Sequence, residues 1–203
     1  MRILHLATEA APCAKAGGRG DVVQGLTDGL HVAGNDSRVL LPDYRLDGNG
    51  EARREVLSDW QSFQAGERNL EYRFARRVQA DGNSCYYLLD CPELFDLGSI
   101  YPGGEDELVR YVLLCRTAAL LCDVLDWQPE ILHCHDWHTS RLVARQAAGL
   151  ESCGPLGDAR SVLTIHNIGY QGAFGAAALA DCGEAALADA LPREADGLGI
   201  NLL

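Results

Sequence analysis

The sequence is poor in basic residues and contains no long apolar segment. Its 203 residues include 17 Lys and Arg against 29 Asp and Glu, which gives a formal net charge of −12. This charge argues against binding to nucleic acid or to an anionic membrane over a broad surface. No apolar run reaches the ~20 residues that span a bilayer, and the N-terminus lacks the apolar region of a signal peptide. We therefore expect a cytoplasmic protein with no nucleic-acid or membrane partner, in which any anion site is local.

Several local motifs of known chemistry are also absent. The eight cysteines are scattered and form no Cys-x-x-Cys pair, so we expect reduced, mostly buried thiols. Cys115 and Cys122 lie seven residues apart, on a predicted helix face that we interpret as core. There is no Gly-x-Ser-x-Gly elbow, and no locally paired carboxylates mark a glycosidase acid and base.

Strands and helices alternate along most of the chain, which predicts an α/β fold with a mainly parallel, Rossmann-like sheet. Between residues 46 and 91, alternating side chains predict an antiparallel insertion instead. The alanine-rich stretch 176–195 is either a helix or a frayed end. The predicted strands are 3–7, 37–41, 70–74, 85–89, 130–134 and 161–165, with a turn at 81–83 and helices that begin at Asp21 and cover 105–126 and 137–148.

A lysine stands beside a glycine-rich turn between the first predicted strand and helix. In the run from Lys15 to Asp21, glycines allow an anion to approach the unpaired amides at the helix start, where the helix dipole is positive. The order of residues excludes a Walker loop, whose lysine follows the glycines. A dinucleotide-binding oxidoreductase is a second possibility, because Gly18 and Gly20 match the first two glycines of the dinucleotide fingerprint and Asp43 matches its acidic residue. Val23 stands where that fingerprint has its third glycine, so the match is incomplete. A turn with a solvated lysine is the simpler alternative.

Polar residues also follow the strand that ends near 134. His133, His135 and His138 have ligand types that suit zinc, which leaves a zinc hydrolase open; hydrogen-bonded histidines at a strand end are the alternative. Asp136 is placed to cap the next helix, to contact a ligand, or both. Trp137 either packs or forms an apolar platform for a sugar.

The last predicted strand is followed by His166 and Asn167 and by a loop in which Tyr170 either stacks on a ligand or packs. A histidine at a strand end is structural in many proteins, so this position alone proves no reaction. Since ligands bind at the carboxyl ends of parallel strands, we expect all three polar segments to share one edge of the sheet.

Together, these segments resemble bacterial glycogen synthase and plant starch synthase, retaining glycosyltransferases that elongate α-1,4-glucans from a nucleotide-glucose donor. The resemblance implies the GT-B architecture, two Rossmann-like domains facing across a cleft. By this resemblance, we expect residues 1–203 to correspond to an incomplete N-terminal domain, with the second GT-B domain outside the given sequence. The segments that carry the resemblance are 1–5, 9–12, 15–23, 41–42, 90–96, 135–138, 164–172 and 199–203.

The resemblance assigns donor contacts to the glycine-rich turn. Lys15 matches a lysine that contacts the diphosphate and sugar, Gly18 a glycine whose amide approaches the donor, and Asp21 a donor-side polar contact. An amide-and-lysine cradle stabilises a departing diphosphate, so no metal or other cofactor is implied. Two departures bear on donor affinity, because Ala16 stands where the family usually has threonine and Arg19 where it has leucine.

The other implied site residues follow the later strands. Asp136 matches an acidic residue of the sugar pocket, and catalytic His166 with Asn167 matches the pair beside the reacting glucose. The implied partners are ADP-glucose, preferred over UDP-glucose, an α-1,4-glucan acceptor, and the missing C-terminal domain. We expect little or no transfer by this chain alone; a binding module for α-glucan or nucleotide is the alternative.

Overall fold

The computed structural model describes residues 1–46, 53–78, 85–104, 106–150, 154–191 and 199–203. Within these residues, eight strands form the main sheet in the order β3-β5-β6-β2-β1-β7-β8, with β4 paired to β5. These strands are β1 (Arg2–Leu6), β2 (Asp36–Pro42), β3 (Arg54–Val56), β4 (Gln61–Ala65), β5 (Arg68–Arg77), β6 (Tyr86–Asp90), β7 (Ile131–His135) and β8 (Arg160–Thr164).

The predicted mixture of parallel and antiparallel pairing is confirmed. β6, β2, β1, β7 and β8 pair in parallel, while β5 runs antiparallel to β6 and carries β3 and β4 as antiparallel neighbours. The turn predicted at 81–83 lies outside the described residues. Because the central strands are covered on both faces, β6 is buried along its whole length.

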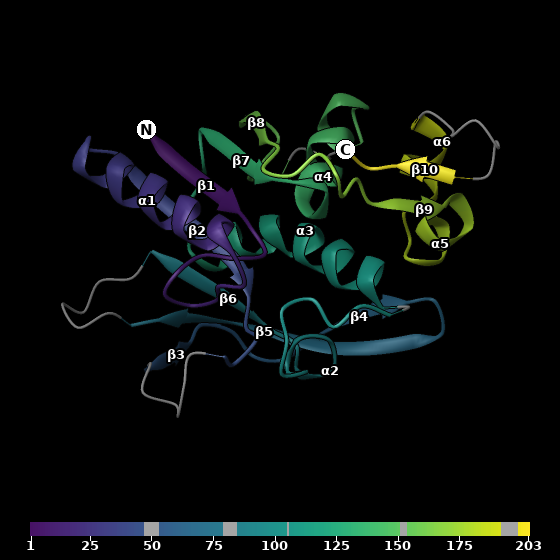
Figure 1. Ribbon diagram of the computed structural model, residues 1–203, viewed down its shortest axis with the longest axis horizontal. Helices are drawn as coiled ribbons and strands as arrows, with labels where there is room; N and C mark the ends of the chain where they lie inside the picture. Colours follow the sequence, from purple (N-terminus) through teal and green to yellow (C-terminus); the bar gives the residue numbers. More distant parts are fainter. Residues whose placement is uncertain (47–52, 79–84, 105, 151–153, 192–198) are drawn as a thin grey trace.

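The helices are α1 (Gly18–Val32), α2 (Pro92–Phe95), α3 (Glu107–Val124), α4 (Trp137–Ala147), α5 (Ala176–Asp181) and α6 (Ala185–Ala190). The short strands β9 (Ala173–Gly175) and β10 (Gly199–Asn201) pair with each other and form a small lobe with α5 and α6, at the right of Figure 1. The stretch 176–195, for which the sequence left open a helix or a frayed end, contains two helices, and its residues 192–195 lie outside the described part.

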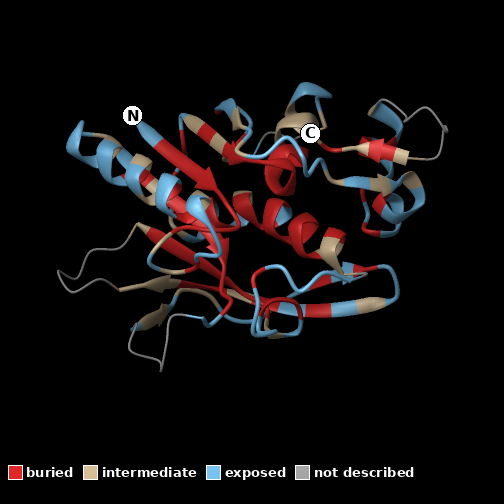
Figure 2. Cartoon of the chain, in the orientation of Figure 1, coloured by how far each residue is buried: buried red, intermediate tan, exposed pale blue. Residues whose placement is uncertain are grey.

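The core is built around α3, which Figure 2 shows mostly buried, in contrast to the largely exposed α1. The predicted cysteine face of α3 is confirmed, since Cys115 and Cys122 are each 1% exposed. No disulfide joins the seven cysteines of the described residues, and Cys153 lies outside them. None of the described helices combines the length and the apolar character needed to cross a bilayer.

Two features of α1 differ from the prediction. The helix begins at Gly18 rather than at Asp21. The apolar spacing of Val22, Leu26 and Leu30 predicts the helix, but Val22 is 50% exposed and the buried residues are Gly20, Val23 and Thr27. The first turn of α1 lies close to the preceding loop, since a Cβ at Gly20 would lie 3.1 Å from the Ala14 carbonyl oxygen. Glycine fits this approach without displacing the loop.

Candidate functional site

The polar segments after β1, β7 and β8 meet at one edge of the sheet. These strands are parallel neighbours, so their carboxyl ends lie together. Asp136, at the end of β7, accepts hydrogen bonds from the backbone amides of His166 and Asn167 after β8, at 2.6 and 3.3 Å. The expected convergence of the segments after β7 and β8 is therefore confirmed by direct contact.

Asp136 does not cap α4 through its side chain, so that part of the prediction is wrong. Its backbone lies in the left-handed region at φ 58°, which is uncommon for a residue other than glycine. In this conformation the carboxylate turns away from α4 and its Oδ1 holds the loop after β8. Strained backbone of this kind is concentrated at functional sites.

Arg19 joins the first loop to Asp136. Its Nε lies 2.8 Å from Asp136 Oδ2, and its Nη1 donates to Thr8 Oγ1 at 3.0 Å and to Tyr101 Oη at 2.9 Å. Tyr101 in turn donates to Glu9 Oε1 at 2.6 Å. Burial of its hydroxyl and this bond to a carboxylate raise the pKa of Tyr101 well above its usual value. Arg19 is thus a largely buried bridge between the first loop and Asp136, with its side chain 15% exposed.

The Lys15 loop is organised by Glu9. Oε2 of Glu9 accepts from the amides of Ala16 and Gly17 at 2.7 and 3.0 Å, which occupies the donors just before α1. Since α1 begins at Gly18, the amides without a carbonyl four residues back in the helix are those of 18–20, not 21–23. Lys15 Nζ lies 2.7 Å from Asp21 Oδ2, and both side chains are about half exposed. Two predicted donor contacts therefore pair with each other.

His133, His135 and His138 do not form the group that a zinc site would need. The described residues instead place ring nitrogens of His5, His133 and His135 within 4.8 Å of one another. His138 stacks on Trp137 with ring centroids 4.1 Å apart. The zinc triad that the sequence left open does not form in the described residues, because His138 lies on α4 and packs there against another ring.

Hydrogen bonds occupy most ring nitrogens in the observed group. His133 Nε2 pairs with Thr164 Oγ1 at 2.7 Å, and His135 bonds both His5 and His166. Burial and the neighbouring imidazoles lower the pKa of His135 to about 2 and that of His5 to about 3. These contacts support the alternative made from the sequence, hydrogen-bonded histidines at a strand end.

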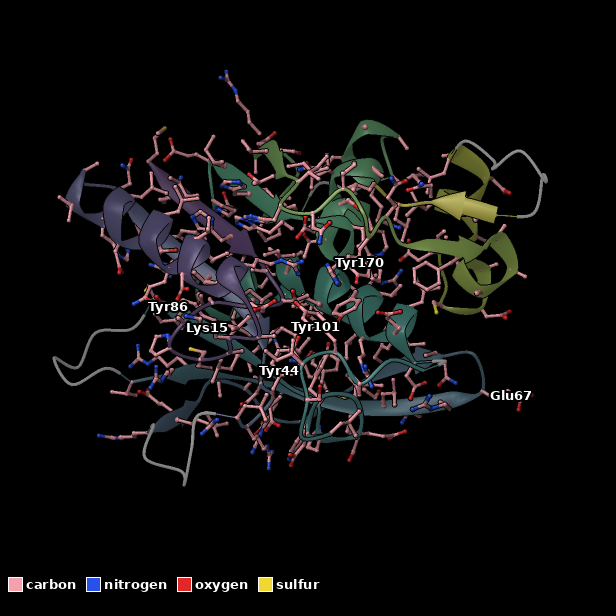
Figure 3. All side chains as sticks on the ribbon, in the orientation of Figure 1. Lys15, Tyr44, Glu67, Tyr86, Tyr101 and Tyr170 are labelled. Atoms are coloured by element: carbon pink, nitrogen blue, oxygen red, sulfur yellow. The ribbon has the colours of Figure 1, made fainter. Side chains whose placement is uncertain are left out.

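A pocket of about 440 Å³ opens beside these contacts, and its walls include Arg19, Tyr101, Trp137, Asn167 and Tyr170. Trp137 is only 5% exposed and packs in the core while also lining the pocket. Tyr170 is 69% exposed, and in the view of Figure 3 Tyr101 lies between it and Lys15. The pocket therefore combines aromatic walls with a few polar groups, a composition suited to a sugar.

Gly172 closes the pocket against the core. It has φ 66°, and a Cβ there would lie 2.4 Å from Cε3 of Trp137. Only glycine fits this approach of the backbone to the indole. The sequence indicated a tight loop here without showing what it packs against.

Sequence reasoning did not assign site roles to His5, Glu9 or Tyr101. Glu9 follows the first strand, and this position at the carboxyl edge was the available signal. His5 and Tyr101 carried no local signal, because their partners lie far away in the chain.

Comparison with known proteins settles the family. The model of the starch synthase catalytic domain matches residues 2–196. This chain belongs to that family. Its resemblance to glycogen and starch synthases is therefore confirmed.

Relatives with curated names agree with the family. Glycogen synthase of Aeromonas salmonicida is 34% identical over 179 residues, which cover 86% of this chain and 36% of the relative. Glycogen synthase of Dechloromonas aromatica is 37% identical over 193 residues, which cover 90% of this chain and 37% of the relative. The chain thus spans little more than a third of the length of these family members.

A solved structure extends the agreement to the fold. The catalytic domain of starch synthase IV from Arabidopsis thaliana, bound to ADP and acarbose, superposes with a TM-score of 0.82 at 29% identity. The match covers 99% of this chain and 42% of that one. The predicted fold, part of a GT-B-like glycosyltransferase, is confirmed.

Proposed function

We propose that this chain forms the N-terminal part of a glycogen or starch synthase that transfers glucose, with retention, from ADP-glucose to the non-reducing end of an α-1,4-glucan. The main support is the match of nearly the whole chain to a starch synthase whose structure holds ADP and acarbose. The meeting of three polar segments beside one pocket adds support from the chain itself. The expected cytoplasmic location stays a prediction.

The donor diphosphate would bind at the start of α1. Amides 18–20, including that of Gly18, and the Lys15 ammonium offer positive potential at one place. An arriving phosphate would compete with Asp21 for Lys15, since both are anions and the present pair is exposed to water. The same cradle would stabilise charge on the departing diphosphate, because its donors are already oriented.

The glucose unit would lie between Asp136 and the loop after β8. Oδ1 of Asp136 is already bonded to two backbone amides, so Oδ2 is the oxygen left for a sugar hydroxyl, in competition with Arg19. Asn167 lines the pocket and offers both amide donors and an acceptor. His166 is partly exposed beside it and is the proposed catalytic residue.

We further propose that a second Rossmann-like domain completes the site. The share of the relatives that this chain spans, about 36%, supports this view. Alone, the chain is then expected to bind ADP without transferring glucose. Appreciable transfer by the purified 203-residue chain would contradict this part of the proposal.

Lys15 is the only lysine of the chain, which allows a direct test of donor binding. Reductive methylation with ¹³C-formaldehyde labels Lys15 and the N-terminus, and we expect added ADP to shift the Lys15 methyl signal while maltotriose does not. Lys15→Met should weaken ADP binding about tenfold, the effect of losing roughly 1.4 kcal/mol of a charge-assisted hydrogen bond.

Arg2→Met is the matched control. Arg2 begins β1 at the opposite end from the Lys15 loop and is similarly exposed, at 49%. Calorimetric titration should give the same ADP affinity for Arg2→Met as for the unaltered chain. Equal losses in the two variants would mean that the cation acts only through net charge and that the cradle is not the ADP site.

A further inference from the structure

Two buried imidazoles connect His166 to the interior of the sheet. His166 Nε2 lies 3.0 Å from His135 Nδ1, and His135 Nε2 lies 3.3 Å from His5 Nδ1. The row ends at Ser37, whose Oγ lies 3.0 Å from His5 Nε2. Neighbouring rings are nearly parallel, with interplanar angles of 17° and 26°, and His5 and His135 are fully buried.

The row allows only two arrangements of protons. Burial holds the pKa of each ring below its usual value, so each imidazole is neutral near pH 7 and carries one N–H. A neutral ring donates from one nitrogen and accepts at the other. Either every ring is protonated on Nδ1 and donates toward His166, or every ring is protonated on Nε2 and donates toward Ser37.

Ser37 selects between the two arrangements. Its side chain is fully buried, and His5 is the one hydrogen-bond partner of its hydroxyl within the described residues. If His5 donated to it, the hydroxyl hydrogen would itself be buried without an acceptor, which is costly. The hydroxyl therefore donates to His5 Nε2, and the protons of the whole row lie on Nδ1.

We propose that Ser37, His5 and His135 are positioning residues that hold His166 in the Nδ1–H tautomer. His166 Nε2 is then occupied as an acceptor, and Nδ1–H is a neutral donor. In the described part of the chain Nδ1 has no protein partner, and the His166 side chain is partly exposed. An oxygen of a bound sugar or phosphate would match this donor; that use rests on the proposed function, whereas the tautomer does not.

His133 lies beside the row without belonging to it. Its ring stacks on His135 with centroids 4.3 Å apart, but its Nε2 is bonded to Thr164. His133 therefore provides a matched control, since it shares a strand, a ring type and a stacking contact with His135 but, within the described residues, has no hydrogen bond to the row.

The test is the tautomer of each histidine. The chain contains six histidines, so ¹⁵N-histidine labelling and long-range ¹H–¹⁵N correlation at pH 7 resolve protonated from unprotonated ring nitrogens. We expect His5, His135 and His166 all to be protonated on Nδ1, opposite to the Nε2–H form that free neutral histidine prefers in water. Protonation of His166 on Nε2 in the unaltered chain would overturn the proposal without any variant.

Two variants test the connection. In His135→Phe the partner of His166 Nε2 is lost, and we expect His166 to change to the Nε2–H form. In His133→Phe we expect His166 to keep its proton on Nδ1. Retention of the Nδ1 proton in His135→Phe would refute the positioning role. No ligand is present in these spectra, so a failure of ADP binding would count against the proposed function and leave this inference untouched.

Discussion

Replacing Arg19 by leucine removes the cation that faces Asp136 in a nearly dry part of the site. The Asp136 side chain is 1% exposed and that of Arg19 is 15% exposed, so water replaces little of the lost interaction. Removing one partner of a buried ion pair costs about 3–5 kcal/mol. Asp136 keeps two backbone donors, and the Arg19 Nε–H is not aligned with Oδ2 as a hydrogen bond. We therefore expect a loss of about 3 kcal/mol in the free energy of unfolding.

Urea denaturation at pH 7 measures this loss, and a double-mutant cycle assigns it to the pair. Asp136→Asn removes the charge while keeping an oxygen for the two amides. The double variant Arg19→Leu/Asp136→Asn should be more stable than the sum of the single losses predicts, by about 1–3 kcal/mol. Arg2→Leu, at an exposed pair 3.8 Å apart, should change stability by less than about 1 kcal/mol. Additive losses within about 0.5 kcal/mol would refute the coupling.

Three other predictions concern stability. Gly172→Ala should lower the free energy of unfolding by about 2 kcal/mol more than Gly149→Ala, as measured by thermal unfolding. Both glycines have φ near 66°, but only a Cβ at Gly172 would clash with the indole of Trp137. Equal losses would contradict the clash. Glu184→Gln removes the buried carboxylate that pairs with Arg116, Arg141 and Arg145, and it should lower the free energy of unfolding by about 3–5 kcal/mol. Glu130→Gln, at the surface, should lower it by less than about 1 kcal/mol in the same assay. Burial lowers the pKa of His138 to about 3. Between pH 6.5 and 3 the unfolded state therefore binds a proton on this ring more readily than the folded state, and stability decreases as the pH is lowered. His138→Phe should reduce that slope in urea titrations by up to about 1.4 kcal/mol per pH unit, and an unchanged slope would be inconsistent with a neutral buried ring.

The sequence predicted most elements correctly because their signals are local. The apolar face of α3 repeats along one helix, and the strands are short apolar runs between polar turns. The buried face of α1 was harder to predict, since Val22 and Val23 are equally apolar and the tertiary packing of α1 decides which of them is buried. In the structure Val23 lies on the buried face with Gly20 and Thr27.

Most of the site residues were placed near one another correctly, but their contacts depend on the tertiary structure. The bond between His5 and His135 joins residues 130 positions apart, and it exists because β1 and β7 are parallel neighbours in one register. The left-handed backbone of Asp136 likewise has no sequence signal, because aspartate is equally suited to an ordinary N-cap. Residue types suggested a chemistry, which stays a prediction, and the register of the strands decided which side chains are partners.

The carboxylates of Glu9 and Asp136 hold two neighbouring loops in place, and this arrangement determines how the loops open. Glu9 and Asp136 each hold two loop amides, and Tyr101 and Arg19 link one carboxylate to the other. Neither loop can leave its carboxylate without disturbing the shared cluster, so the four amides should exchange hydrogen with solvent in a single cooperative opening. We therefore expect a ligand that binds one loop to slow exchange in both, so that the proposed donor and sugar sides of the site respond as one thermodynamic unit.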